Sequence, residues 1–183
     1  WAMALVLMAM HAGADVRLDG RALADDQGPF LGLGATYMNA LHDAKFKPER
    51  LRHELDWLKR HGFNFIRVLS MVGYHSFWEG YEIAPVDFVN RDGKSVAAWP
   101  DYEAQLLGLI DAADACGLRI ELTLFADAQI MPDVEARRAH MDRILRIVNS
   151  RRDKVLMLEV ANEAWQNGFP GDDGEAQLRA FGA

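Results

Sequence analysis

The stretch Leu156–Gly168, with sequence LMLEVANEAWQNG, joins a buried-strand pattern to residues suited to acid–base chemistry. Its mostly apolar run leads directly into Asn162 and Glu163, and parallel strands covered on both faces show such runs. The carboxyl ends of these strands are where α/β proteins place their chemistry. A glutamic acid there can protonate a glycosidic oxygen, and a neighbouring asparagine can bind a sugar hydroxyl. The alternative is that the pair forms only a turn and a helix start.

Strand geometry adds two expectations for this motif. Adjacent residues of a regular strand point to opposite faces, so the strand must bulge or break if Asn162 and Glu163 both reach one site. Glu159 shares the face of Glu163 and would lie deeper. Because a buried carboxylate must be paired, we expect Glu159 to bind Arg67, with Glu121 as a rival partner for that arginine.

The elements that would position these residues alternate along the chain. Asp19-Gly20, between two short alternating runs, predicts a β-hairpin, and a second turn follows at residues 25–28. Strands are predicted at residues 29–38, 63–70, 118–125 and 154–161. Helices are predicted from Lys47 to the Gly62 cap, at 101–116 and at 132–150, with a helix-like run from Glu175. This alternation favours the α/β class with a parallel sheet.

One helix face and one long segment carry further predictions. In the helix at 132–150, we expect the apolar stripe to form the inner face, and its members are Met141, Ile144, Leu145 and Val148. The aromatic- and glycine-rich segment at 71–100 is long for a connection inside a compact domain, and such connections are usually functional.

Composition limits the classes of protein. The chain has 183 residues, of which 50% are hydrophobic and 26% charged, and this favours one folded domain. The formal net charge of -7, without a basic block, argues against nucleic acid and anionic membrane as partners. Cys116 is the single cysteine, so no disulfide can form within the chain, and we interpret it as a small buried residue.

The first residues are predicted to be separate from the fold. Ala2 to Met10 is apolar but too short to span a bilayer, and Ala12-Gly13-Ala14 resembles a signal-peptidase site. We therefore interpret residues 1–14 as a signal-peptide remnant and residues 15–183 as the folded domain, of a secreted or periplasmic protein. The alternative is an apolar strand or helix of the domain itself.

The predicted strands resemble those of a known family. The pieces are the DGR hairpin, GLGATYMNAL, GFNFIRVLS, GLRIELTLF and LEVANEAW. On these, residues from about Val16 to Phe169 resemble the N-terminal half of a (β/α)8-barrel glycoside hydrolase of the clan that contains family 5, the cellulase and mannanase type. The resemblance implies a TIM barrel truncated to about its first four βα units, since a whole barrel needs about 250 residues.

The resemblance also implies roles for particular residues. Glu163 matches the acid/base, Asn162 the residue that binds the sugar 2-hydroxyl, and Arg67 the arginine that positions the nucleophile. Arg67 as a core ion-pair residue is the alternative. The nucleophile would be a glutamate at the end of strand seven, with no counterpart here. Family 5 members commonly carry a histidine near the end of strand three, where we expect Asp127 to substitute.

Aromatic and polar side chains near the strand ends are candidate sugar contacts, because sugars stack on aromatic rings. For the rings after the second strand, Phe77 included, the alternative is packing of the loop onto the barrel, and for Tyr37 and Asn39 it is packing in the core. The predicted substrate-binding residues, besides Asp127, are Trp165, Tyr37, Asn39, Tyr74, His75 and Trp78.

These features predict a retaining hydrolase of β-linked poly- or oligosaccharide, inactive when limited to these 183 residues. A metal-dependent sugar isomerase or epimerase barrel and a non-catalytic carbohydrate-binding barrel are the alternatives. His42, Asp43 and His75 lack tight ligand spacing, so we predict no metal site and no cofactor. The expected partner is a carbohydrate substrate, without nucleic acid, without membrane after signal cleavage, and with the full-length protein a monomer.

Overall fold

The computed structural model describes residues 16–182, so the predicted signal-peptide remnant lies outside the described residues. The described chain begins with a small antiparallel sheet of β1 (Arg17–Asp19), β2 (Ala22–Asp25) and β3 (Gly28–Pro29). Gly20 makes the first turn at φ 63°, a conformation that glycine adopts without steric cost. The predicted hairpin is confirmed.

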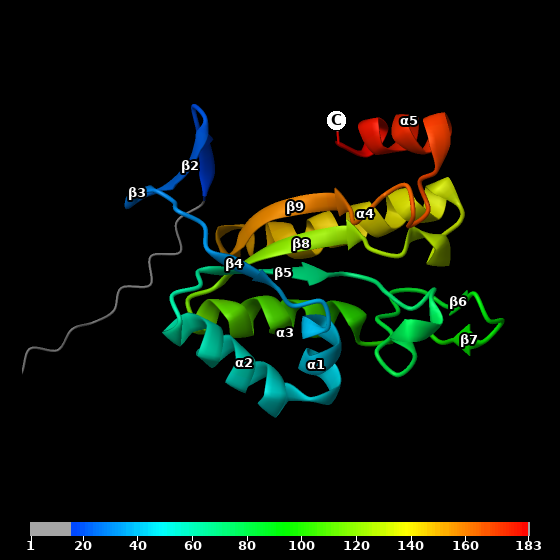
Figure 1. Cartoon of the computed structure of the whole chain (residues 1–183), viewed down its shortest axis with the longest axis horizontal. Helices are drawn as coiled ribbons and strands as arrows, with labels where there is room; N and C mark the ends of the chain where they lie inside the picture. Colours follow the sequence, from blue (N-terminus) through cyan, green and yellow to red (C-terminus); the bar gives the residue numbers. More distant parts are fainter. Residues whose placement is uncertain (1–15, 183) are drawn as a thin grey trace, which may run out of the picture.

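A parallel sheet forms the centre of the molecule. Its strands are β4 (Gly34–Thr36), β5 (Phe65–Leu69), β8 (Arg119–Phe125) and β9 (Val155–Ala161), paired in that order and all parallel. In Figure 1 the strands point the same way, and the β1–β3 sheet lies at the end opposite their arrowheads. The predicted α/β class is confirmed.

Helices connect the strands and cover one face of the sheet. Pro48 at the first turn of the second helix and a left-handed Gly62 after it agree with the predicted start and stop. Among residues 16–182, no helix is both long and apolar enough to cross a bilayer. The helices are α1 (Ala40–Phe46), α2 (Pro48–Arg60), α3 (Tyr102–Ala115), α4 (Val134–Asn149) and α5 (Gly171–Gly182).

The predicted long segment at 71–100 contains only short elements. These are the 3-10 helix Ser76–Trp78 and the strand pair β6 (Phe88–Val89) and β7 (Ser95–Val96). In Figure 1 this segment extends beyond the arrowhead of β5, at the end of the sheet where the candidate chemistry lies.

The two faces of the sheet differ in polarity. Ile66, Val68, Ile120 and Leu122 are fully buried and belong to the hydrophobic core that the helices cover. Each such side chain stabilises the fold by about 1.5–3 kcal/mol. On the opposite face, Arg67 lies between Ile66 and Val68, and Glu121 and Thr123 flank Leu122, because successive strand residues point to opposite faces.

The first strand is shorter than predicted. Residues 29–38 were expected to be one strand, whereas β4 covers only Gly34–Thr36. The side chain of Asn64 explains the difference: it accepts from the Leu33 amide and donates to the Leu31 carbonyl, both at 2.8 Å, and so replaces ladder partners. Gly34 then lies against the Phe65 ring, where an added Cβ would sit 2.2 Å from the ring.

The inner face of α4 differs from the prediction at one position. Ile144 and Val148 are buried as expected, but Leu145 is 37% exposed. His140 and Arg137 turn inward instead, and Arg137 donates from Nε to the Met131 carbonyl at 2.6 Å. Both residues share one helical stripe with Ile144, Ile147 and Val148, and Leu145 lies off that stripe. Burial lowers the pKa of His140 to about 3, so this ring packs as a neutral group.

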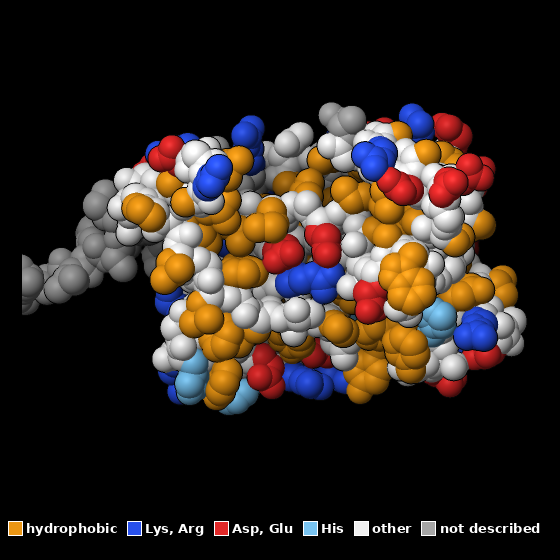
Figure 2. Space-filling model, turned by 45° about the horizontal axis from the view of Figure 1, so that its top comes forward, with side chains coloured by type: hydrophobic (Ala, Val, Ile, Leu, Met, Phe, Trp, Pro, Cys, Tyr) orange, Lys and Arg blue, Asp and Glu red, His pale blue; other side chains and the backbone are white. Residues whose placement is uncertain are grey.

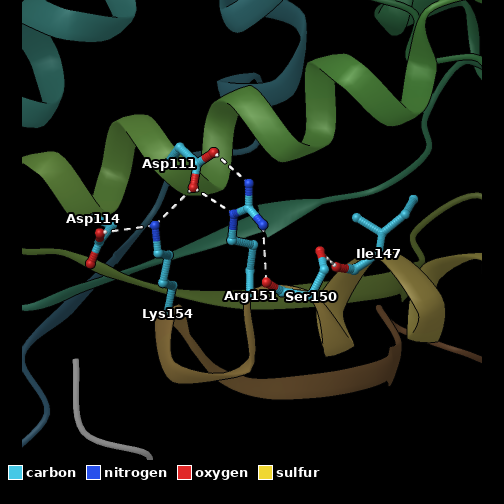
Figure 3. Close-up of polar contacts among 6 residues, drawn as sticks. All are labelled: Asp111, Asp114, Ile147, Ser150, Arg151 and Lys154. Atoms are coloured by element: carbon cyan, nitrogen blue, oxygen red, sulfur yellow. Dashed lines mark hydrogen bonds and ion pairs between the residues drawn. The ribbon is translucent and has the colours of Figure 1, made fainter.

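An ion cluster fastens the turn before β9 to α3 (Figure 3). This outer ion cluster consists of Asp111 and Asp114 on α3 with Arg151 and Lys154 after α4. Asp111 accepts from Arg151 Nε and from Lys154 Nζ, both at 2.8 Å, and Lys154 also lies 3.2 Å from Asp114. These two donors lower the pKa of Asp111 to about 2.

Candidate active site

A pocket opens at the carboxyl ends of β5, β8 and β9. Its volume is about 260 Å³. It brings together five of the predicted site residues: Asn162, Glu163, Asp127, His75 and Trp78. The rest of the lining is Met38, Leu69, Val72, Phe77, Ala126, Gln166 and Asn167.

The strand end at Asn162 and Glu163 breaks as expected. β9 ends at Ala161, and the Asn162 amide still donates to the Phe125 carbonyl at 3.0 Å. Glu163 has φ 40°, the only left-handed non-glycine residue among those described. A left-handed glutamate is uncommon and costs conformational energy, as often found at functional sites. This backbone break lets both side chains line one pocket.

Below the pocket, polar side chains on the open face of the sheet form an inner ion cluster of Arg67, Glu121, Thr123 and Glu159. Arg67 donates from Nε to Glu159 at 2.8 Å and makes a second contact through Nη2. Thr123 donates to the same carboxylate oxygen at 2.5 Å. Near the middle of the face drawn in Figure 2, acidic and basic side chains lie side by side, with mainly hydrophobic and uncharged groups immediately around them.

The contact of Arg67 with the rival partner, Glu121, is longer than its hydrogen bond with Glu159. The nearest oxygen of Glu121 lies 3.9 Å from Arg67 Nε, so one guanidinium faces two carboxylates. Burial and the nearby charge of Glu159 raise the pKa of Glu121, and Arg67 offsets only part of that rise. The expected pairing of Arg67 with Glu159 is therefore confirmed.

Arg67 also fixes the orientation of Asn162. Its Nη2 donates to Asn162 Oδ1 at 3.0 Å. A guanidinium can only donate, so the amide oxygen must face Arg67 and the amide nitrogen is left for another acceptor. Because Asn162 lines the pocket, a sugar hydroxyl is a suitable acceptor. The side chain of Asn167 supports the same turn by donating to the Asn162 carbonyl at 2.9 Å.

Asp127 follows β8 and connects the pocket to the long segment after β5. Its Oδ2 accepts from the Gly73 amide at 2.8 Å and the Tyr74 amide at 3.1 Å. Burial raises the pKa of Asp127, and the two backbone donors oppose that rise. The carboxylate therefore holds the segment that carries His75 and Trp78.

The remaining predicted contacts lie outside the pocket lining. Trp165 is 72% exposed, and Tyr74 contacts His75 edge-on at 5.1 Å. Tyr37 donates its hydroxyl to Asp43 at 2.8 Å, and burial together with this hydrogen bond raises the Tyr37 pKa. Asn39 precedes α1 without capping it through its side chain. Their roles as substrate-binding residues stay predictions.

Several residues of the site were not predicted from the sequence. Thr123 is fully buried and supports Glu159, and Gln166 and Asn167 line the pocket. Asn167-Gly168 is a turn pair that could have marked this loop. Phe77, by contrast, was among the aromatic residues considered for sugar contacts; it lines the pocket, is 72% exposed, and stacks on His75 with ring centroids 5.4 Å apart. Across residues 16–182, no group of three or more His, Cys, Asp or Glu side chains could hold a metal ion.

Comparisons with known proteins give a fold but no sequence relative. No protein-family model matches the chain, and no curated protein matches it. Among solved structures, an exo-β-1,4-mannosidase from Opitutaceae bacterium strain TAV5 matches with TM-score 0.63 and 19% identity, over 90% of this chain and 31% of that one. A family 5 glycoside hydrolase from Bacteroides vulgatus ATCC 8482 matches with TM-score 0.59 and 16% identity, over 92% and 38%.

The fold is that of family 5 glycoside hydrolases. An endo-1,4-β-mannanase from Rhizomucor miehei matches as well, with TM-score 0.58, 13% identity and coverage of 81% of this chain and 48% of that one. The chain thus spans 31–48% of the length of these barrel enzymes. The resemblance in the strand motifs is confirmed at the level of the fold.

Proposed function

We propose that this chain forms the acid/base half of a retaining glycoside hydrolase that acts on β-linked poly- or oligosaccharides. The observation that carries the proposal is the Asn162–Glu163 pair at the end of β9. Both side chains line one pocket, and Arg67 orients the asparagine. The barrel fold shared with glycosidases supports it.

In this proposal Glu163 protonates the leaving glycosidic oxygen and then, as the conjugate base, activates water. The amide nitrogen of Asn162 donates to the sugar 2-hydroxyl, a contact that strengthens in an oxocarbenium-like transition state. The nucleophilic carboxylate would come from the part of the barrel that residues 1–183 do not contain. Arg67, already bound to Glu159, would position that nucleophile.

β-Mannosides are the first substrates to test, because the similar structures include a mannosidase and a mannanase. The protein that carries this chain should form a covalent adduct with a 2-deoxy-2-fluoro-β-mannosyl fluoride, seen as a mass increase of one fluorosugar. Hydrolysis should survive EDTA, whereas a metal-dependent isomerase would lose activity. Absence of both adduct and turnover on mannosides and glucosides would contradict the proposal.

The isolated segment gives a separate test. Residues 1–183 alone should show no turnover, because the proposed site lacks its nucleophile. Measurable hydrolysis by this segment would refute that part of the proposal. Secretion and a monomeric full-length protein likewise remain predictions.

A further inference from the structure

The carboxylate of Asp127 accepts backbone hydrogen bonds through one oxygen, Oδ2, and its other oxygen, Oδ1, has no partner among residues 16–182. The side chain is buried, with 3% of the residue exposed, yet it lines the pocket beside Glu163. Two backbone amides of the segment after β5, those of Gly73 and Tyr74, donate to Oδ2. Within residues 16–182, no hydrogen bond or ion pair reaches Oδ1, and this atom is not sealed from solvent.

The backbone that faces Asp127 is fixed by packing. Gly73 has φ 140°, a conformation that glycine adopts and other residues avoid. An added Cβ at Gly73 would lie 2.6 Å from the Phe88 ring. Consequently the shape of the segment holds the two N–H groups toward one carboxylate oxygen, and a half-turn of the symmetric carboxylate only exchanges which oxygen accepts them.

The charges around the pocket favour a neutral ligand. Asp127 and Glu163 are its acidic lining residues, and no lysine or arginine is among the described lining residues. His75 is the basic side chain nearest Asp127 in the lining. The guanidinium of Arg67, below the pocket, is already engaged by Glu159 and Asn162. A carboxylate or sulfate on the ligand would meet repulsion here, whereas a hydroxyl can donate.

We propose that Asp127 determines the substrate class of this pocket, with Oδ2 holding the segment after β5 and Oδ1 accepting a hydroxyl of a neutral sugar. The same oxygen excludes uronic acids and other anionic sugars. This inference rests on the proposed function for its sugar ligand, and it adds the chemical class of that sugar.

The substitution Asp127→Asn separates the two tasks of the carboxylate. The backbone amides need an acceptor, so the new amide oxygen should face Gly73 and Tyr74 and keep the segment in place. The amide nitrogen then faces the pocket and turns an acceptor into a donor. The thermal midpoint should stay close to that of the parent protein, while ligand selection changes.

The experiment measures binding by calorimetry in a Glu163→Gln background, which prevents consumption of the ligand. The probes are β-1,4-mannotriose and its anionic counterpart, β-1,4-trimannuronate. Loss of a charge-assisted hydrogen bond should weaken mannotriose binding about tenfold or more. Removal of the negative charge should at the same time improve trimannuronate binding relative to mannotriose, so the preference for the neutral trisaccharide shrinks.

Asp87→Asn is the matched control. Asp87 also clamps the long segment, by accepting from the Ala98 amide at 2.7 Å, but it lies outside this pocket. This variant should leave both affinities unchanged. Equal affinities in the Asp127→Asn and parent proteins, or an equal loss in the Asp87→Asn control, would overturn the inference.

The outcomes distinguish this inference from the proposed function. Selective mannotriose binding that depends on Asp127, without any hydrolysis by the Glu163-containing protein, would support the inference and contradict the enzyme. Hydrolysis of mannosides by the parent protein, with no effect of Asp127→Asn on either affinity, would support the proposed enzyme and contradict the inference about Asp127.

Discussion

The inner and outer ion clusters use the same residue types in opposite ways. The outer cluster pairs Asp111 and Asp114 with Arg151 and Lys154, so two negative charges meet two positive ones at a partly exposed turn. The inner ion cluster sets one guanidinium against Glu121 and Glu159 on the open face of the sheet. The first is balanced, and the second carries an excess negative charge.

Their surroundings explain the difference. The side chains of Arg151 and Lys154 donate to Asp111 on α3 and so fasten the turn before β9 to that helix. Arg67 instead reaches past Glu159 to Asn162, which lines the pocket. A balanced surface cluster contributes modest stability, whereas a cluster with fewer cations than carboxylates keeps its arginine strongly held. We infer that the outer cluster fastens the turn before β9 to α3, whereas the inner cluster orients Asn162 at the pocket.

The largest contrast should come from removing each arginine. Arg67→Met leaves two carboxylates without their cation and should lower the free energy of unfolding by about 3 kcal/mol. Arg151→Met should lower it far less, because Asp111 keeps Lys154 as a partner and the outer cluster is partly exposed to solvent. Urea denaturation of both variants measures the difference. Equal losses would contradict the distinction between the clusters.

The pH dependence of stability should have opposite sign in the two clusters. The folded-state pKa of Glu121 is raised, so its ionised form costs stability, and this cost appears as pH rises from the unfolded pKa to the folded pKa. Glu121→Gln should therefore stabilise the protein at pH 7 and have a smaller effect at pH 4. A destabilised Glu121→Gln variant at pH 7 would show that this carboxylate is needed as a charge.

Asp111 should behave in the reverse way. Its folded pKa of about 2 lies below the ordinary 3.8, so its stabilisation is present above pH 3.8 and lost as pH falls toward 2. Asp111→Asn should cost about 1 kcal/mol at pH 7, a value kept small because the side chain is exposed. Comparing denaturation of variant and parent at pH 7 and pH 3 checks the sign, and a cost that grows on acidification would contradict it.

The smallest change in the free energy of unfolding should come from removing one hydroxyl group near each cluster. Thr123→Val removes one donor to Glu159 and should cost about 0.5–1 kcal/mol, since the site is buried. Ser150→Ala is the control in the outer turn, where its hydroxyl donates to the Ile147 carbonyl at 2.7 Å (Figure 3), and should cost less. A larger loss from Ser150→Ala would reverse the comparison.

The sequence predicted the parts of the fold that depend on local pattern. The apolar runs ending at Phe125 and Ala161 marked two strands of the sheet, and Gly62 marked a helix end. The prediction failed where a distant side chain decides the local backbone. Asn64 shortens the first strand, and Arg137 and His140 join the buried stripe of α4 while Leu145 lies off it.

The residues of the candidate site likewise divide into those that local sequence predicted and those that depend on distant parts of the chain. Asn162 and Glu163 could be predicted because they directly follow a strand. The pairing of Arg67 with Glu159 was also predicted, because Glu159 shares the face of Glu163 and a buried carboxylate needs a partner. The hydrogen bond from Thr123 to Glu159 was not predicted, because it depends on the register between β8 and β9, which spacing along the chain does not give. The role of Asp127 as a clamp likewise depends on the path of residues 71–100, which no periodic pattern specifies.

The most direct test of the proposed site compares two glutamates on the same segment. Glu163→Ala, assayed with an aryl β-mannoside whose leaving group needs no protonation, should stall at the glycosyl-enzyme and be rescued by azide, a nucleophile that needs no general base. Glu159→Ala should lose activity through Arg67 and show no rescue. Azide rescue and a glycosyl azide product with Glu163→Ala alone is the predicted result. Full activity of Glu163→Ala without azide would contradict it.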